Sequence, residues 1–215
     1  MPVDIVPRTG GVMDGGAGYN IQNAIALLNS TYSAGVDAYG NLIVMTEGTK
    51  PTYSVASIGF ALPATPTQIF SMMGSATKTV RILRVSVSGF AAVASQTIML
   101  GLQKLSTAPT GGTPVNPTIV AHDTGMNAVS SILSTNVAHY TALPTLGTGL
   151  YVRTRPTLFG LATTAAGDAA VWDFTTRNGQ GMVLRGVSQG IAINLNGIAL
   201  ANATTLAYDV EWSEE

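Results

Sequence analysis

Apolar and polar residues alternate along much of the last two thirds of the chain. The alternation is regular in Thr97–Leu105, Gly190–Asn196 and Leu206–Trp212, and a period of two is typical of strands with one buried face. In Lys78–Gly89 the apolar positions change parity at Leu83, which predicts a strand with a β-bulge at that residue. These four segments are the most regular part of a predicted β-structure.

Weaker patterns predict further short strands between these segments. They are Thr118–His122, Ser131–Tyr140 (a segment that is also compatible with a helix), Leu150–Arg155, Ala170–Phe174 and Gly181–Arg185. The pair Asn178-Gly179 favours a β-hairpin between the last two, and Thr107–Pro117 predicts a long loop. About eight strands separated by turns predict an all-β fold, namely an antiparallel β-sandwich with a jelly roll as the favoured type.

The N-terminal part of the chain has a different pattern. Residues 1–18 are rich in Gly and Pro and predict an extended arm. In Tyr19–Ser30 the apolar residues recur at helical spacing, which predicts one short amphipathic helix. Ile21, Ile25 and Leu28 share one face of this helix. We expect that face to dock either on a neighbouring subunit or on its own domain.

A proline-rich segment separates the two parts. Thr46–Thr67 carries Pro51, Pro63 and Pro66 and predicts an extended connector. The sequence therefore predicts an N-terminal arm, helix and connector in residues 1–62 and a β-sandwich domain in residues 63–215.

Composition limits the classes of function. Of the 215 residues, 46% are hydrophobic and 10% are charged, so the chain can bury a large core and has a surface that is poor in charge. Interface cores between subunits are depleted in charge, which favours assembly with other chains. Ten Lys and Arg against eleven Asp and Glu give a net charge of -1, and this balance disfavours nucleic-acid binding.

Cysteine and long apolar segments are both missing from the sequence. The absence of Cys excludes disulfides, thiolate zinc sites and iron–sulfur clusters. The weakly polar stretches Phe90–Leu102 and Gly186–Ala201 fall short of the ~20 apolar residues of a membrane-spanning helix. The first residues lack the pattern of a secretory signal. We therefore expect no membrane association, and a protein that acts where it is made or leaves the cell by assembly or lysis.

Candidate catalytic and metal-binding residues are few. His122 and His139 with one carboxylate are a conceivable metal site, but their spacing matches no metal motif, and the alternative places His122 in a turn and His139 on a sheet face. Asp209 and Glu211 share one face of a predicted strand. They form either a catalytic carboxylate pair or a solvated outer face that pairs with Arg81 or Arg185. We expect no cofactor, no resident metal and no enzymatic activity.

Trp172 lies between Asp168 and Asp173 in the sequence. An aromatic side chain between carboxylates is typical of a platform on which a sugar ring stacks, and it is also typical of a buried tryptophan in a strand. Tyr140 and Tyr151 are the other candidates for such a platform.

Arginines provide a second predicted interface. Arg81 and Arg84 lie close together on one predicted strand. We expect them to pair with Asp209, Glu211 and the last carboxylates of the chain across a subunit interface. With the apolar face of the predicted helix, these residues form the predicted interaction surface.

Three blocks of the sequence carry a resemblance. They are QIFSMMGSATKTVRILRVSV from Gln68 to Val87, the later VWDFTTRNGQGMVLRGVSQGIAINLNG, and the terminal YDVEWSEE. Across roughly residues 65 to 215 the chain resembles small virion-associated proteins of tailed bacteriophages. The resemblance implies a β-sandwich structural protein of the virion, assembled in the host cytoplasm. It implies a capsid decoration or cement protein that bridges subunits of the major capsid protein or other virion proteins, and a homo-oligomer, with a trimer as the first expectation.

Three other functions stay open at this point. The nearest is a tail or fibre component that contacts a host receptor or serves as an adaptor. A carbohydrate-binding module would use Trp172, Tyr151 or Tyr140 as its stacking platform. An enzyme is the third alternative.

Overall fold

The computed structural model describes residues 50–125, 129–163, 167–175 and 181–215, and the part from Lys50 to Glu215 forms one compact unit. The described residues are all-β, with one helical turn. The elements are β1 Thr52–Ala61, β2 Gln68–Met73, β3 Thr79–Ala91, β4 Gln96–Leu105, β5 Thr113–Val115, β6 Val120–Ala121, the 3-10 turn η2 Ser134–Asn136, β7 Val137–Ala142, β8 Gly149–Leu161, β9 Ala169–Asp173, β10 Met182–Arg185, β11 Gly190–Asn194 and β12 Thr204–Glu214.

The strands form one curled sheet in the order β5-β7-β2-β11-β4-β8-β3-β12-β1-β6, with β9 and β10 both paired to β3. Nearly all of the pairs are antiparallel. The pairing of β3 with β8, through Phe90 with Gly160 and Ala91 with Leu161, is parallel. The sheet is therefore mixed, and the prediction of a purely antiparallel arrangement was wrong at this junction.

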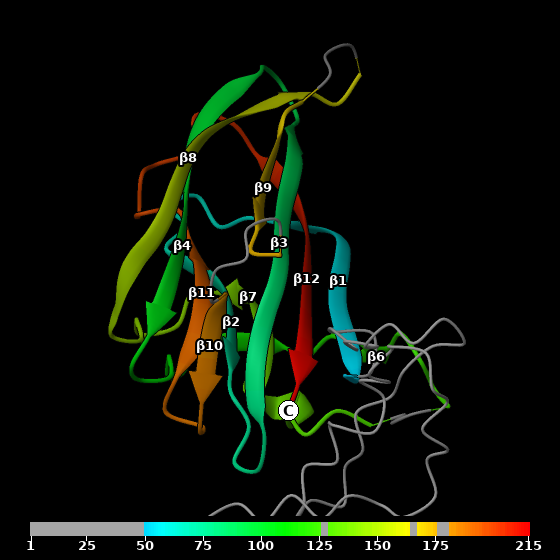
Figure 1. Ribbon diagram of the computed structural model, residues 1–215. Coiled ribbons are helices and arrows are strands. Elements are labelled where there is room, and N and C mark those ends of the chain that lie inside the picture. The colour runs from blue at the N-terminus through cyan, green and yellow to red at the C-terminus, as the bar shows by residue number, and fades with distance from the viewer. Residues whose placement is uncertain (1–49, 126–128, 164–166, 176–180) are drawn as a thin grey trace, which may run out of the picture. The chain divides into compact units, whose positions relative to one another are not determined.

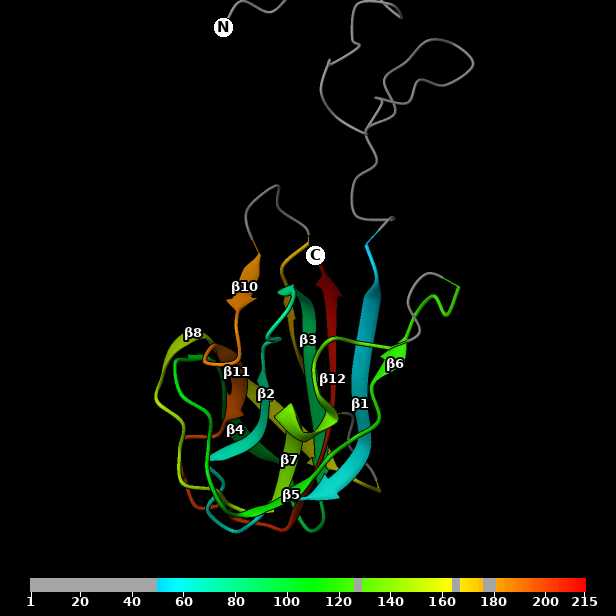
Figure 2. The ribbon, with the colours of Figure 1, turned by 90° about the horizontal axis from the view of Figure 1, so that it is seen from below.

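The curl brings two halves of the sheet face to face (Figures 1 and 2). We call them the β12 half, which holds β1, β12, β3, β9 and β10, and the β11 half, which holds β7, β2, β11, β4 and β8. Aromatic rings from both halves meet in one core. Phe70 on β2 lies 4.7 Å from Tyr208 on β12, and Phe60 on β1 lies 4.4 Å from His139 on β7, measured between ring centroids.

Strand β12 shows why the alternating sequence folds in this way. Leu206, Tyr208, Val210 and Trp212 are all buried in the core, and the residues between them are partly exposed on the outer face. Burial of each such side chain contributes about 1.5–3 kcal/mol to folding. The alternation therefore sets which face of β12 points inward, because a shift of one residue would expose the whole apolar set.

The predicted bulge at Leu83 is confirmed. Glu211 pairs with Arg84 and Trp212 pairs with Ile82, so that Leu83 is left without a partner on β12. The extra residue allows Ile82 and Val85 both to point into the core despite their odd spacing.

The predicted hairpin at Asn178-Gly179 is wrong in its pairing. Both β9 and β10 pair with β3, on either side of the bulge, and they follow one another in the same direction. They do not pair with each other. The Asn-Gly residues themselves lie outside the described residues.

The segment predicted as a connector contains a full strand. β1 pairs with β12 over most of its length, and its side chains Tyr53 and Val55 are buried. Pro51 and Pro63 flank the strand, where a missing N–H group does not break the ladder. The predicted arm, the predicted helix Tyr19–Ser30 and hence the division at residue 62 are not decided, because residues 1–49 lie outside the described part.

One ambiguous segment is settled, and one predicted loop is corrected. Ser131–Tyr140, which was compatible with strand or helix, contains η2 followed by the first residues of β7. The predicted loop Thr107–Pro117 contains the short strand β5, which pairs with β7 at the end of the sheet.

Candidate functional site

The outer face of the β12 half carries most of the charged residues that the sequence suggested for an interface. Arg84 lies directly opposite Glu211 on β12 and opposite Asp173 on β9. One step along the strands, Asp209 lies opposite Ser86 on β3 and Ala56 on β1. The structure thus places Arg84, Asp209 and Glu211 together on one solvent-facing surface.

Arg81 pairs with one of the predicted last carboxylates of the chain, but the pair forms within one chain. Its guanidinium forms an ion pair with the Glu215 carboxylate, to which the Lys50 ammonium also bonds. The hydrogen bond from Arg81, followed by that from Lys50, lowers the pKa of the Glu215 side chain to about 2. In the described residues, no ion pair joins Arg81 or Arg185 to Asp209 or Glu211. Glu215 instead links Lys50, before β1, to Arg81 on β3.

Glu214, one of the last carboxylates expected to pair with an arginine, is buried, with 2% of its surface exposed. Its carboxylate accepts hydrogen bonds from the Ser130 hydroxyl (2.5 Å), the Ser131 backbone N–H (2.9 Å) and the Trp212 indole N–H (3.1 Å). These hydrogen bonds hold Ser130 and Ser131, which precede η2, against the end of β12. No local sequence pattern predicts this contact, because the acceptor and its serine donors are more than 80 residues apart.

The remaining predicted interface residues, Ile21, Ile25 and Leu28, lie outside the described residues. Their role in docking stays a prediction.

The two histidines do not share a site. The His122 backbone N–H donates to the carbonyl of Thr52, the first residue of β1. His139 is 8% exposed and its Nδ1 lies 3.1 Å from the Tyr208 hydroxyl oxygen in the core. Burial lowers the pKa of His139. In the part of the chain that the structure describes, no group of three or more His, Cys, Asp or Glu side chains is arranged to hold a metal ion.

Of the three predicted sugar-stacking residues, two are excluded by burial. Trp172 is 7% exposed and belongs to the core, and Tyr140 is also buried, with its hydroxyl 2.9 Å from that of Ser71. Tyr151 on β8 is 44% exposed, but its ring covers Gly101 on the neighbouring strand and its hydroxyl donates to Asn196. Tyr151 is therefore the one member of the three with an accessible ring.

A network of buried amides on the outer face of the β11 half was not predicted. The Gln103 side-chain oxygen accepts hydrogen bonds from Gln68 and Asn194, both at 3.0 Å. Gln68 also bonds to both backbone groups of Gly147, which fixes the loop before β8 over the sheet. These amides occupy polar positions in the alternating pattern, so the sequence indicated an exposed face where the structure has a covered one.

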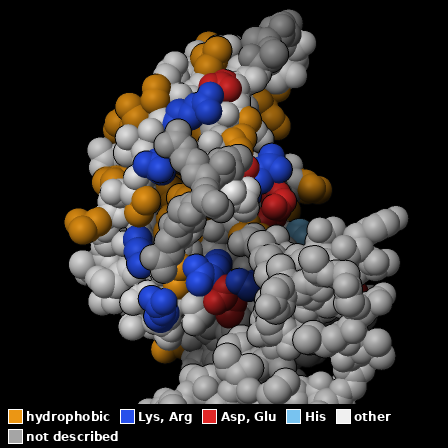
Figure 3. Space-filling view, viewed as in Figure 1, with side chains coloured by type: hydrophobic (Ala, Val, Ile, Leu, Met, Phe, Trp, Pro, Cys, Tyr) orange, Lys and Arg blue, Asp and Glu red, His pale blue; other side chains and the backbone are white. Residues whose placement is uncertain are grey.

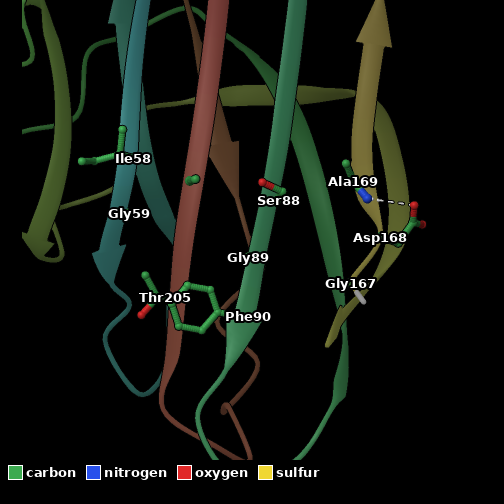
Figure 4. Close-up of a pocket in the computed structure, with 10 residues that line it drawn as sticks. Ile58, Gly59, Ser88, Gly89, Phe90, Gly167, Asp168, Ala169 and Thr205 are labelled. Atoms are coloured by element: carbon green, nitrogen blue, oxygen red, sulfur yellow. Dashed lines mark hydrogen bonds between the residues drawn. The ribbon is translucent and has the colours of Figure 1, made fainter. Parts of the chain in front are cut away.

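The outer face of the β12 half also contains a hollow of about 320 Å³ (Figure 4). It lies at the end of this half where β3 pairs in parallel with β8. Strands β1, β12 and β3 and the start of β9 contribute to it. Its lining residues are Ile58, Gly59, Ser88, Gly89, Phe90, Gly167, Asp168, Ala169, Thr205 and Ala207. The sequence pattern around Trp172 indicated Asp168 as a carboxylate of a possible sugar site. It did not indicate Ser88, Phe90 or Thr205.

Large apolar side chains are exposed at several separate places. Figure 3 shows hydrophobic side chains spread over one face, with acidic side chains beside basic ones. Those more than half exposed in the described residues are Ile58, Val93, Val120, Val129, Leu133, Leu146, Leu150, Val187 and Ile198. Ile58 is fully exposed because the register of β1 against β12 shifts between Ser57 and Phe60, which pushes it out of the sheet.

Comparison with protein-family models, with curated proteins and with solved structures finds no match to this chain. Among the described residues, no helix has the length and apolar character required to cross a bilayer.

Proposed function

We propose that this chain is a non-enzymatic virion structural protein, most specifically a capsid decoration or cement protein, built on a jelly-roll β-sandwich. The strand order is the observation that carries the proposal. Eight strands fall into two antiparallel groups of four, β1-β12-β3-β9 and β2-β11-β4-β8. The chain passes from one group to the other at every step except between β4 and β8, which are neighbours.

This alternation is the connectivity expected of a jelly roll, in which two Greek keys wrap around one core. Jelly rolls are characteristic of viral capsid proteins and also of lectins. The strand order therefore favours a particle protein or a glycan-binding protein over other classes of all-β protein.

The surface supports an assembled protein. Single exposed apolar residues are common on monomers, but here they accompany a chain with only 10% charged residues. Contact with the major capsid protein, or with further copies of this chain in a homo-oligomer such as a trimer, would cover such residues. Each contact needs only modest affinity when a protein binds several neighbours on one particle.

A particle-binding experiment tests the cement role. Virus particles are prepared from the encoding genome with this coding sequence deleted, and purified full-length protein is added back. We expect the protein to sediment with the particles and to raise the temperature at which they release their genome. A protein that remains in the supernatant would contradict the proposal.

A truncated chain provides the second arm of the experiment. Residues 50–215 have their own core, so a chain that lacks residues 1–49 separates the contribution of the N-terminal segment. If that segment docks on the capsid, the truncated chain binds more weakly than the full chain. Equal binding would show that residues 50–215 make all of the contacts that bind the particle. Binding at the tail alone would favour a tail or fibre component.

A further inference from the structure

The hollow on the outer face of the β12 half has the features of a small-molecule site, and this inference goes beyond the proposed structural role. Its floor is low because the strands carry small residues there, with Ala207 on β12 and Ser88 and Gly89 on β3. Phe90 and Asp168 stand at its border (Figure 4). Its volume of about 320 Å³ lies at the lower end of the range for ligand sites.

Two hydroxyl groups in the hollow have unused hydrogen-bonding capacity. Within the described residues, neither the Ser88 hydroxyl nor the Thr205 hydroxyl forms a hydrogen bond, and Figure 4 shows the Ser88 hydroxyl directed toward β12. Each of these groups can both donate and accept a hydrogen bond. They therefore suit a ligand that carries hydroxyl groups of its own.

The hollow is close to electrically neutral. The Asp168 carboxylate accepts hydrogen bonds from the Arg155 guanidinium, at 3.1 Å to Oδ2, and from the Ala169 backbone N–H, at 2.8 Å to Oδ1. Because each carboxylate oxygen has more than one lone pair, Asp168 can still accept a hydroxyl hydrogen. Its ion pair with Arg155 balances the charge, so the site favours neither an anion nor a cation.

One border of the hollow is apolar. Phe90 is 44% exposed on the outer face of β3 and lies directly opposite Thr205 on β12. Figure 4 shows its ring beside Thr205. An exposed aromatic ring next to hydroxyl and carboxylate groups matches a ligand that has both C–H and O–H surfaces.

We propose that this hollow binds a neutral pyranoside. A pyranose ring presents axial C–H groups that pack on Phe90, and its hydroxyls can pair with Ser88, Thr205 and Asp168. A purely apolar ligand would leave the Ser88 and Thr205 hydroxyls without partners, and the charge of an ionic ligand would find no opposite charge, because Asp168 is already paired with Arg155. The site therefore takes the sugar role that the sequence suggested for Trp172, which is buried in the core.

Saturation-transfer NMR on the full chain tests the proposal. The probes are the methyl glycosides of glucose, galactose, mannose and N-acetylglucosamine, each measured separately at millimolar concentration. We expect at least one of them to receive saturation from the protein. Absence of transfer to all four would overturn the proposal.

Three variants locate the site. Phe90→Ala removes the apolar border, Ala207→Leu fills the floor, and Tyr151→Ala removes the exposed tyrosine ring on the other half of the molecule. We expect the first two to reduce the transfer to the level of the protein-free control, and Tyr151→Ala to leave it unchanged. Far-ultraviolet circular dichroism verifies that each variant is folded. Transfer that survives both Phe90→Ala and Ala207→Leu, or that is lost only in Tyr151→Ala, would assign sugar binding to another surface. Neither result bears on the particle-binding experiment, so failure of the sugar site is distinguishable from failure of the cement role.

Discussion

At the scale of single residues, His139 places an imidazole in the described core. The His139 ring stacks on Phe60 and is hydrogen-bonded to the Tyr208 hydroxyl, and no described acidic residue forms an ion pair with it. Burial lowers the pKa of His139 below its ordinary value of 6.5. The folded protein therefore prefers the neutral imidazole, whereas the unfolded chain takes up a proton at a higher pH.

This difference makes stability depend on pH. We expect the free energy of unfolding to fall as the pH is lowered from 7.5 through 6.5 toward the folded-state pKa, because the unfolded chain binds the proton first. Urea unfolding at several pH values measures the effect. His122→Asn is the matched control and retains the pH dependence, whereas His139→Asn reduces it. A steep fall of stability in this pH range that persists unchanged in His139→Asn would contradict the assignment.

Residue-level prediction from the sequence succeeded for side chains whose role depends on near neighbours in the chain. Asp209 and Glu211 were expected on one outer face, and they lie there because β12 alternates regularly. The burial of Glu214 and the amides around Gln103 depend on loops that return from distant parts of the chain. No local pattern carries that information.

At the scale of elements, regular alternation was a reliable guide to strands and short-range turn signals were not. The segments now assigned to β3, β4, β11 and β12 were all predicted. β1 was missed because its Ser, Ala and Gly residues give weak contrast between faces and prolines stand on both sides of it. The Asn-Gly signal suggested a hairpin between β9 and β10. Both strands pair with the long strand β3 instead of with each other.

The bulge in β3 yields a prediction at this scale. Deletion of Leu83 would remove the extra residue and force either Val80 and Ile82 or Val85 and Val87 to the outer face. Exposure of two such side chains costs about 3–6 kcal/mol. We expect the deletion variant to lose most of its cooperative thermal unfolding, whereas Leu83→Ala, which keeps the register, melts close to the parent protein. Similar melting of the deletion variant and the parent would show that the bulge does not set the register.

At the scale of the whole molecule, the strand order is the observation on which the proposed particle role rests. The all-β class followed from periodicity alone. The order of strands did not, because it depends on pairings between segments as far apart as β1 and β12, which no local signal specifies. The parallel contact between β3 and β8, where the two halves meet, is likewise a consequence of how the sheet curls.

The most direct test of the structural role is the amount of this protein in purified virus particles. Quantitative mass spectrometry of particles produced from the encoding genome gives its copy number relative to the major capsid protein. A decoration or cement protein is expected at a copy number of the same order as the major capsid protein. Absence from the particles, or a copy number as low as that of tail components, would contradict the account.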